Sequence, residues 1–259
     1  MTDVAQSFEK AVETYRQFLD SAGLVVPLLR IEVHVESTRD WSQVATMGDV
    51  RSWFEGQRAS CPMRVADIPL NEARGWIVDP DTGDVHHESG EFFTVHGIRV
   101  TQSDGREVGE GGWDQPIMEQ VGYDGGLLGI LRRRINGVPH YLIEAKAEPG
   151  NYETIQMSPT LQATFSNLKR AHQGRKPRFA ELFEEPEGHG ATVLYSQWLS
   201  EDGGRLHLKR NRGMLVEVPE DIPVDAPESF MWMSMWQIKE CLNENAWVNP
   251  HIRGIVAHM

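Results

Sequence analysis

Apolar residues recur at helical intervals through residues 5–21, which predicts an N-terminal helix that ends near Gly23. A second short helix is expected after Asp49, with Trp53 and Phe54 as its apolar contacts. Between these helices, residues 24–35 alternate weakly and end in β-branched residues at every second position, which predicts a strand.

Two prolines mark residues 61–70 as a connector between larger units. We therefore place a boundary near residue 70. It separates an N-terminal arm of helices and a strand, residues 1–70, from a main domain, residues 71–259.

The main domain is expected to be rich in strands. Residues 84–100 contain two short candidates, and residues 127–135 and 138–147 form the clearest pair. Asn136-Gly137 joins that pair, and both residues of a type I′ hairpin turn need a positive φ angle, which this dipeptide favours.

The last third of the chain predicts a second hairpin, between residues 193–199 and 205–209, and a further strand over 214–218. A capping box of Ser234 and Gln237 then predicts a C-terminal helix. The fold class expected from these elements is α+β, a mixed or antiparallel sheet flanked by helices.

Composition narrows the functional classes. Lys and Arg total 25 while Asp and Glu total 38, which gives a net charge of −13. This charge argues against nucleic-acid binding, which depends on neutralising phosphates. No apolar run of about 18 residues predicts a membrane span, and the N-terminus lacks a secretory signal. The two cysteines, Cys61 and Cys241, are expected to be small buried residues of a cytoplasmic protein.

Residues 144–170 hold the densest group of polar residues. In a strand Glu144, Lys146 and Glu148 share one face. They form either a solvated ladder of ion pairs or part of a site. Ser158 and Pro159 fit the start of a helix, whereas residues 160–166 also fit a strand. Both alternatives produce a row of uncharged hydrogen-bonding groups, which suits a sugar.

Basic residues gather at 132–134, at 169–176 and at 209–212. Guanidinium groups bind phosphate oxygens in a bidentate way, so such a group can hold a phosphorylated ligand. No phosphate-binding loop, dinucleotide fingerprint or nucleophile elbow occurs. His86, His87 and His96 make a weak metal candidate, because adjacent histidines in a strand point to opposite faces. Neither a metal nor a redox cofactor is expected.

Several strings resemble the NDP-hexose 2,3-dehydratases of deoxysugar and antibiotic biosynthesis. The resemblance covers roughly residues 70–255. It rests on EARGW (72–76), HHESGEFF (86–93), WDQP (113–116), EAKAEPGN (144–151), QMSPTLQATFSN (156–167), LHLKRNRGMLVEV (206–218) and WVN (247–249).

The resemblance implies a fold related to the Nudix hydrolases, although this chain has no Nudix box. It also implies loss of water across C2 and C3 of dTDP-4-keto-6-deoxy-glucose, giving a 3,4-diketo-2,6-dideoxy sugar. Family members usually carry two tandem copies of the unit, and this chain has one, so a homodimer is expected. The chain differs from the usual pattern at Glu144, where glutamine is common, and at Pro250 and His251, where Met-Asp is common.

The site residues that we expect follow from the polar segments together with this resemblance. Candidate catalytic residues are Lys146, Glu148 and His172. Candidate substrate-binding residues are Trp76, Trp113, Gln115, Asn151, Gln156, Ser158, Thr160, Gln162, Thr164, Ser166, Asn167, Arg170, Lys209, Arg210 and Arg212. The competing hypotheses are a non-catalytic dTDP-sugar-binding subunit with the same fold, and a lyase or isomerase acting on another keto compound.

Overall fold

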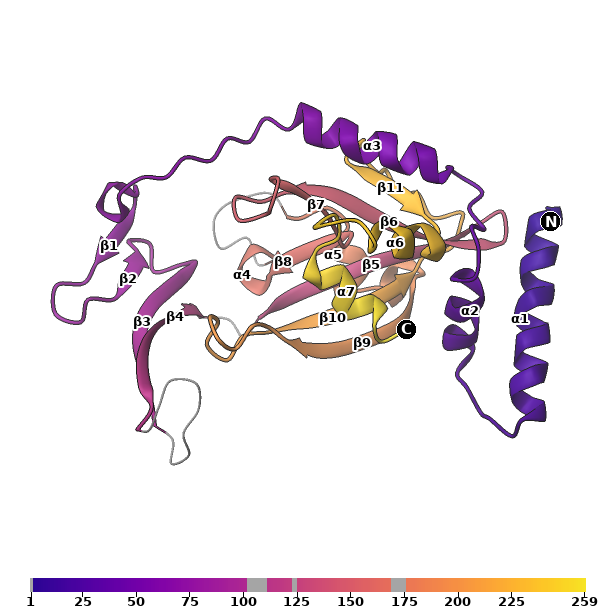
Figure 1. Cartoon of the computed structure of the whole chain (residues 1–259), viewed down its shortest axis with the longest axis horizontal. Coiled ribbons are helices and arrows are strands. Elements are labelled where there is room, and N and C mark those ends of the chain that lie inside the picture. The colour runs from indigo at the N-terminus through magenta and orange to yellow at the C-terminus, as the bar shows by residue number, and fades with distance from the viewer. Residues whose placement is uncertain (1, 102–110, 123–124, 169–175) are drawn as a thin grey trace.

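A computed structural model describes residues 2–101, 111–122, 125–168 and 176–259. A mixed sheet with helices packed on it forms the body (Figure 1). A small antiparallel sheet lies at one end of this body and an N-terminal helical pair lies at the other. The helices are α1 (Asp3–Ser21), α2 (Leu28–Glu36), α3 (Met47–Ser60), α4 (Phe165–Leu168), α5 (Ala180–Glu184), α6 (Met235–Cys241) and α7 (Pro250–Val256).

The body sheet is built around one hairpin, which joins β5 (Gly126–Ile135) to β6 (Val138–Ala147). Asn136 and Gly137 have φ angles of 52° and 85°, so the predicted turn is confirmed. The strand order is β11-β6-β5-β10-β9, and β10 runs parallel to β5. The other strands are β7 (Ile155–Ser158), which pairs with β6, β8 (Leu161–Thr164), which pairs with β5, β9 (Thr192–Ser200), β10 (Arg210–Glu217) and β11 (Phe230–Met233).

The two faces of this sheet pack against separate apolar layers. Ile130 belongs to a layer that contains Phe54 of α3 and Ile252 of α7, whereas its neighbour Leu131 belongs to a layer that contains Phe183 of α5. Alternation along a strand sends successive side chains to opposite faces, so the apolar run of β5 fits a strand covered on both sides. The expected α+β class is confirmed.

The predicted strand over residues 24–35 is wrong, because residues 28–36 form helix α2. This helix lies beside α1, and Ile31, Val33 and Val35 are buried together with Glu32 and Glu36. Burial on several sides gives an apolar pattern with no clear helical stripe. A short β-branched segment of this kind cannot be assigned from its periodicity.

The second predicted hairpin is correct in its first strand and wrong in its second. Strand β9 pairs antiparallel with β10, which includes the strand expected over 214–218. Residues 205–209 form a connection instead. The capping box of Ser234 and Gln237 is complete, with both of its hydrogen bonds present at the start of α6.

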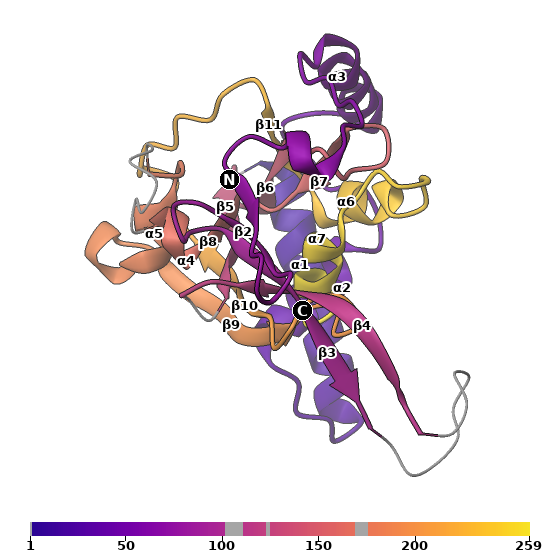
Figure 2. The same cartoon turned by 90° about the vertical axis from the view of Figure 1, so that its left-hand side faces the viewer.

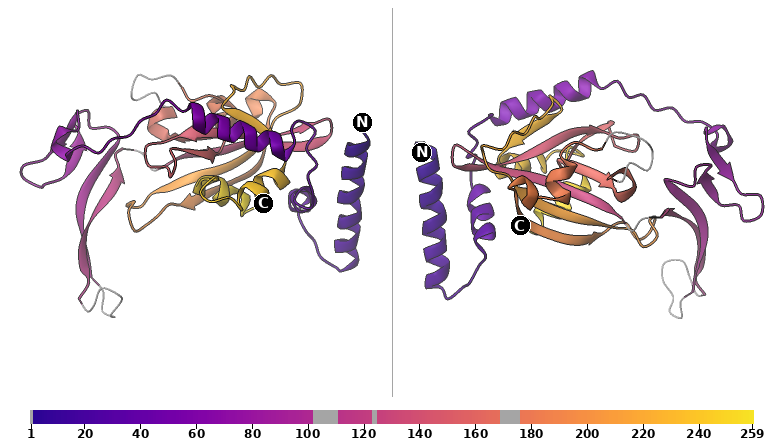
Figure 3. Two further views of the ribbon diagram at one scale, coloured as in Figure 1. Left: turned by 45° about the horizontal axis from the view of Figure 1, so that its top comes forward. Right: turned by 180° about the vertical axis from the view of Figure 1, so that it is seen from behind.

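The small sheet has the order β1-β2-β3-β4 and projects away from the body (Figures 2 and 3). It follows the short 3-10 turn η1 (Leu70–Glu72) and consists of β1 (Trp76–Val78), β2 (Val85–His87), β3 (Phe93–Val100) and β4 (Trp113–Gln120). Main-chain hydrogen bonds join it to the connection before β10. Met118 N–H donates to the Arg205 carbonyl at 2.9 Å, and His207 N–H donates to the Met118 carbonyl at 2.8 Å.

Val50 and Phe54 of α3 lie in the core of the body, although residue 70 was expected to mark the start of the main domain. The boundary at residue 70 stays a prediction about independent folding. Among the described residues, none of the helices combines the length and apolar character that crossing a membrane requires.

Candidate active site

A polar cavity of about 330 Å³ opens where β5, β6, β8 and β10 come together. Two lysines, two glutamates and a histidine line it together with amide and hydroxyl side chains. Such a concave site with converging polar groups is the usual form of a small-molecule site. Its lining residues are Leu128, Lys146, Glu148, Gln162, Ala163, Thr164, Asn167, Glu201, Leu206, Lys209, Asn211 and His251.

Lys146 near the end of β6 and Glu148 just after it both line the cavity, in agreement with the alternation expected from the sequence. The Lys146 ammonium donates to the carbonyl of Gln162 at 3.3 Å. The Gln162 side-chain amide donates to the Glu148 carboxylate at 2.9 Å. These bonds place a cation and an anion side by side at the wall of the cavity.

Asn249 holds the C-terminal segment against this wall. Its side-chain amide donates to the Ser158 hydroxyl at 2.8 Å and to the Gln162 side-chain oxygen at 3.2 Å. Its own oxygen accepts from the N–H of Ile252, so Asn249 is also the N-cap of α7. The first turn of α7 is thereby fixed at the edge of the cavity.

His251 enters the cavity from that first turn. Its Nδ1 atom lies 3.6 Å from a carboxylate oxygen of Glu201, which follows β9. Burial lowers the pKa of His251, although the negative charges of Glu201 and Glu148 oppose the shift. The imidazole is therefore neutral at physiological pH and able to accept a proton.

The basic cluster at 209–212 is divided by the alternation of the chain. Lys209 and Asn211 face the cavity. Arg210 lies 4.5 Å from the centre of the Trp198 ring, and Arg212 donates to the Ser196 hydroxyl at 2.8 Å. Burial lowers the pKa of Lys209, while the Glu201 carboxylate favours its charged form. Of these three basic side chains, Lys209 is the one that lines the cavity.

A second, more apolar cavity of about 260 Å³ adjoins the first and shares Thr164, Asn167, Leu206 and Lys209 with it. The small sheet supplies its outer wall through Phe92, Phe93, Met118 and Gln120, and Ser166 completes the lining. The two cavities together form a continuous groove with a polar end and an aromatic end.

Three predicted binding residues of the small sheet, Trp76, Trp113 and Gln115, make contacts outside the groove. The Trp76 ring packs against Phe93 at 4.6 Å between ring centres, behind the cavity lining. The indole N–H of Trp113 donates to the side-chain oxygen of Gln115, and the Gln115 amide donates to the Gly204 carbonyl. None of these three residues lines either cavity.

Other predicted binding residues hold the wall in place. Asn151 donates to the carbonyls of Lys146 and Thr154, and Gln156 donates to that of Ala246. Ser158 and Thr160 are buried, and the Thr160 hydroxyl bridges β5 and β6 through main-chain atoms of Leu131 and Leu142. Residues 161–164 form a strand, and a helix begins only at Phe165. Arg170 and His172 lie outside the described residues.

Sequence reasoning missed Glu201, Asn211, His251, Phe92 and Phe93. Asn211 and both phenylalanines lie inside the strings that carry the family resemblance, whereas Glu201 lies between the two strands of the second predicted hairpin. His251 was noted as a departure from the family pattern. No local spacing links Glu201 to His251, because the fold alone brings them together.

Comparison with known proteins points to one family. A family model described as NDP-hexose 2,3-dehydratase matches residues 47–259. A dTDP-4-dehydro-6-deoxy-alpha-D-glucopyranose 2,3-dehydratase from Streptomyces violaceoruber is 41% identical over 207 residues, which cover 80% of this chain and 45% of the relative. Enzymes of the same name from Amycolatopsis orientalis and Saccharopolyspora spinosa are 36% and 40% identical, over 85% and 79% of this chain and 46% and 40% of theirs. The chain spans about half the length of these curated relatives.

Solved structures that resemble the chain include the Ap4A hydrolase of C. elegans, with a TM-score of 0.32 and 11% identity. They also include RenU, a Nudix hydrolase of M. smegmatis, with a TM-score of 0.33 and 14% identity. The matches cover 53% and 62% of this chain, and 95% and 97% of the two structures.

Proposed function

The chain belongs to the NDP-hexose 2,3-dehydratase family, and from this premise we propose that it removes water across C2 and C3 of dTDP-4-keto-6-deoxy-glucose. The observation that carries this proposal is the groove itself. Its polar end gathers Lys146, Glu148 and His251, and its aromatic end, a cavity of about 260 Å³, is lined by Phe92 and Phe93. Dehydration of this substrate needs groups that transfer a proton and stabilise charge at the sugar. It also needs a separate binding pocket for the nucleotide.

The C4 ketone of the substrate makes the C3 proton acidic. In our proposal neutral His251 accepts this proton, and Glu201 beside its Nδ1 stabilises the imidazolium that forms. The imidazolium then returns the proton to the departing C2 hydroxyl, which leaves as water. The resulting enol tautomerises to the 3,4-diketone, so protons and electrons balance within this chain and its substrate.

Negative charge develops on the C4 oxygen when the proton leaves. The Lys146 ammonium is the cation that we assign to that oxygen, because electrostatic stabilisation of an enolate requires a fixed positive group. Gln162 connects that lysine to Glu148, because its carbonyl accepts from the ammonium and its side-chain amide donates to the carboxylate. Thr164 and Asn167 provide uncharged hydrogen-bonding groups for the sugar hydroxyls. Lys209 lies between the two cavities and suits the pyrophosphate, with Phe92 and Phe93 beside the thymine.

We propose that two copies of the chain pair through an exposed apolar surface. Apolar side chains are exposed along the connector and the first strand of the small sheet, and a second copy would cover them. They are Val65, Ile68, Leu70, Ile77 and Val78. Light scattering during size-exclusion chromatography tests this, with twice the chain mass of 29.3 kDa as the expected result. Both cysteines are free, with Cys241 buried and Cys61 partly buried, and free cysteines support our proposal of a cytoplasmic location.

The function is tested by incubating the purified chain with dTDP-4-keto-6-deoxy-glucose. We expect consumption of the substrate, with the diketone trapped by a 3-ketoreductase. No turnover, together with protection against heat by dTDP, would favour the non-catalytic sugar-nucleotide-binding subunit. If the chain neither turns over the substrate nor binds dTDP, a lyase or isomerase acting on a different keto compound would be favoured.

The pH dependence of turnover tests the role of His251. Its neutral form is the active base, and burial depresses its pKa below the ordinary value of about 6.5. We expect kcat/KM to stay level from pH 8 through neutrality and to fall only below about pH 6.5, as protonation removes the base. The His251→Gln variant should lose this limb, and an identical limb in that variant would assign the titration to another group.

A further inference from the structure

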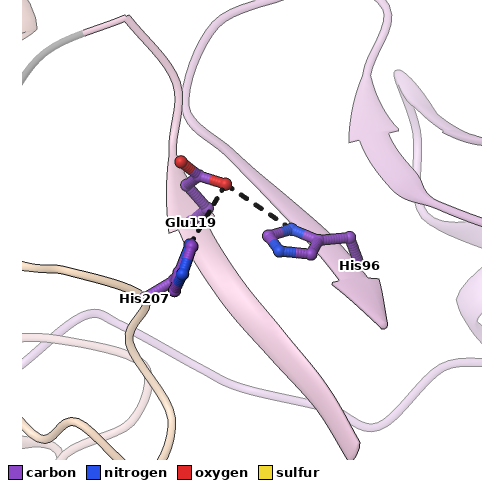
Figure 4. Close-up of side chains that lie close together, drawn as sticks. All are labelled: His96, Glu119 and His207. Carbon is purple, nitrogen blue, oxygen red and sulfur yellow. Dashed lines mark ion pairs between the residues drawn. The ribbon is translucent and has the colours of Figure 1, made fainter. Parts of the chain in front are cut away.

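Three side chains outside the groove converge on one point beside the small sheet. They are His96 on β3, Glu119 on β4 and His207 in the connection before β10 (Figure 4). Within the part of the chain that the structure describes, this is the one group of His, Cys, Asp or Glu compact enough to hold a metal ion. One ligand atom from each residue lies within 4.8 Å of the others.

The strand register explains how these residues meet. Glu119 lies opposite Thr94, so His96, two residues along β3, is its diagonal neighbour on the same face. On the other edge of β4, Met118 forms a parallel bridge with Leu206. Glu119 follows Met118 and His207 follows Leu206, so both point to the face opposite to that pair. Glu119 therefore lies beside His207.

The distances fit metal ligands better than direct hydrogen bonds. The Nδ1 atoms of His96 and His207 lie 3.7 Å and 3.5 Å from the same carboxylate oxygen of Glu119. Hydrogen bonds from N–H to oxygen are usually about 2.7–3.2 Å long. Neighbouring ligands of a tetrahedral zinc ion, at roughly 2.0–2.2 Å from the metal, lie about 3.3–3.6 Å apart.

A second observation points to a missing ligand. The Nδ1 atom of His207 is buried and has no hydrogen-bond partner among the described residues. Buried polar atoms without a partner are uncommon and need an explanation such as an ion. This atom also faces Glu119, toward the point where the three side chains converge (Figure 4).

We propose that His96, Glu119 and His207 bind a divalent transition-metal ion, with zinc the best match. Imidazole nitrogen favours zinc over magnesium or calcium, which prefer ligand sets made only of oxygen. Two histidines and one carboxylate leave the fourth tetrahedral position to water.

The metal would act as a clip between the small sheet and the body. Two of its ligands belong to the sheet and the third to the connection that carries Leu206 and Lys209 into the groove. Among the described residues, several direct hydrogen bonds cross this junction. They include the main-chain bonds of Met118, the Gln115 amide on the Gly204 carbonyl and the Lys209 ammonium on the Gln120 side chain. Binding of the ion would hold the aromatic wall of the groove at a fixed distance from its polar end.

The test uses the full chain without an affinity tag, treated with a chelator and titrated with Co²⁺ and Zn²⁺. We expect one ion per chain, a visible spectrum typical of tetrahedral Co²⁺, and a higher melting temperature with Zn²⁺. His207→Gln and Glu119→Gln should each weaken binding by more than about tenfold, because loss of a direct ligand exceeds the effect of an outer-shell change. Circular dichroism verifies that these variants fold.

His189→Gln is the matched control, because His189 is exposed on the short turn η2 (Glu187–His189), away from the cluster. It should bind Zn²⁺ as the original chain does. A chain that binds no Zn²⁺ in the micromolar range, or ligand variants that bind as well as the control, would overturn the proposal. Neither result depends on turnover, so the clip and the proposed dehydratase activity can fail separately.

Discussion

Replacing Lys146 with methionine should lower kcat by about 10²- to 10³-fold, the usual effect of losing one fixed group that stabilises an oxyanion. Lys146 is placed on the cavity wall by its bond to the Gln162 carbonyl, next to Glu148. Methionine keeps the length of the side chain and removes the charge. Because the C4 ketone carries little charge before the C3 proton leaves, the change should affect kcat far more than the binding of dTDP.

Steady-state kinetics and dTDP binding by calorimetry separate these effects. Lys239→Met is the matched control, since Lys239 lies on α6 and does not line the groove. It should turn over substrate at the original rate. Full turnover by Lys146→Met would remove Lys146 from the mechanism, and a parallel loss of dTDP binding would show a general change of the groove.

Replacing Arg132 with methionine should lower the free energy of unfolding by about 3–5 kcal/mol, the usual cost of breaking a buried ion pair from one side. Only 1% of the Arg132 side chain is exposed. Its guanidinium binds Glu32 at 2.6 Å and Glu36 at 3.0 Å, and it also binds Glu217 on β10. Without this cation Glu36 keeps only the Tyr141 hydroxyl as a partner, and Glu32 keeps only the partly exposed Arg134.

Urea unfolding followed by circular dichroism measures this loss. Arg99→Met is the control, because Arg99 forms an exposed pair with Asp114 on the small sheet and its removal should leave stability almost unchanged. Adding Glu36→Gln to Arg132→Met should recover part of the loss, since it removes one of the stranded charges. Equal stability of the Arg132 and Arg99 variants would contradict the assigned role.

The fold was predictable wherever a local signal determines the backbone. Asn136-Gly137 and the capping box of Ser234 and Gln237 act through atoms only a few residues apart, and both predictions are confirmed. Helix α2 was not predictable, because its burial depends on α1 and on the distant Arg132. The partner of β9 was missed for a similar reason, since a connection of nine residues, 201–209, leaves the pairing register undetermined.

The residues of the candidate site were likewise predictable only where a local sequence pattern marked them. Lys146, Glu148, Gln162, Thr164, Asn167 and Lys209 lie in segments whose composition or family resemblance drew attention to them, and the structure brings them to one cavity. The arginines at 210 and 212 failed to join them because alternation sends every second residue of the chain away from the groove. His251 comes to the cavity through α7, and no local pattern in the sequence links it to Lys146 or Glu201.

The hydrogen bond from Asn249 to Ser158 joins residues that are 91 positions apart in the chain. Helix α7 is only seven residues long, and Asn249 caps its start. Ile252 and Ile255 anchor this helix in the apolar layer on the sheet. Undocking would expose these two side chains and break the bonds of Asn249, which is a smaller loss than melting the sheet. Each such opening carries His251 away from Lys146 while the rest of the molecule stays folded. Under the mechanism proposed above, only molecules with this helix docked can carry out the reaction, and amide hydrogen exchange in α7 would report the docking equilibrium directly.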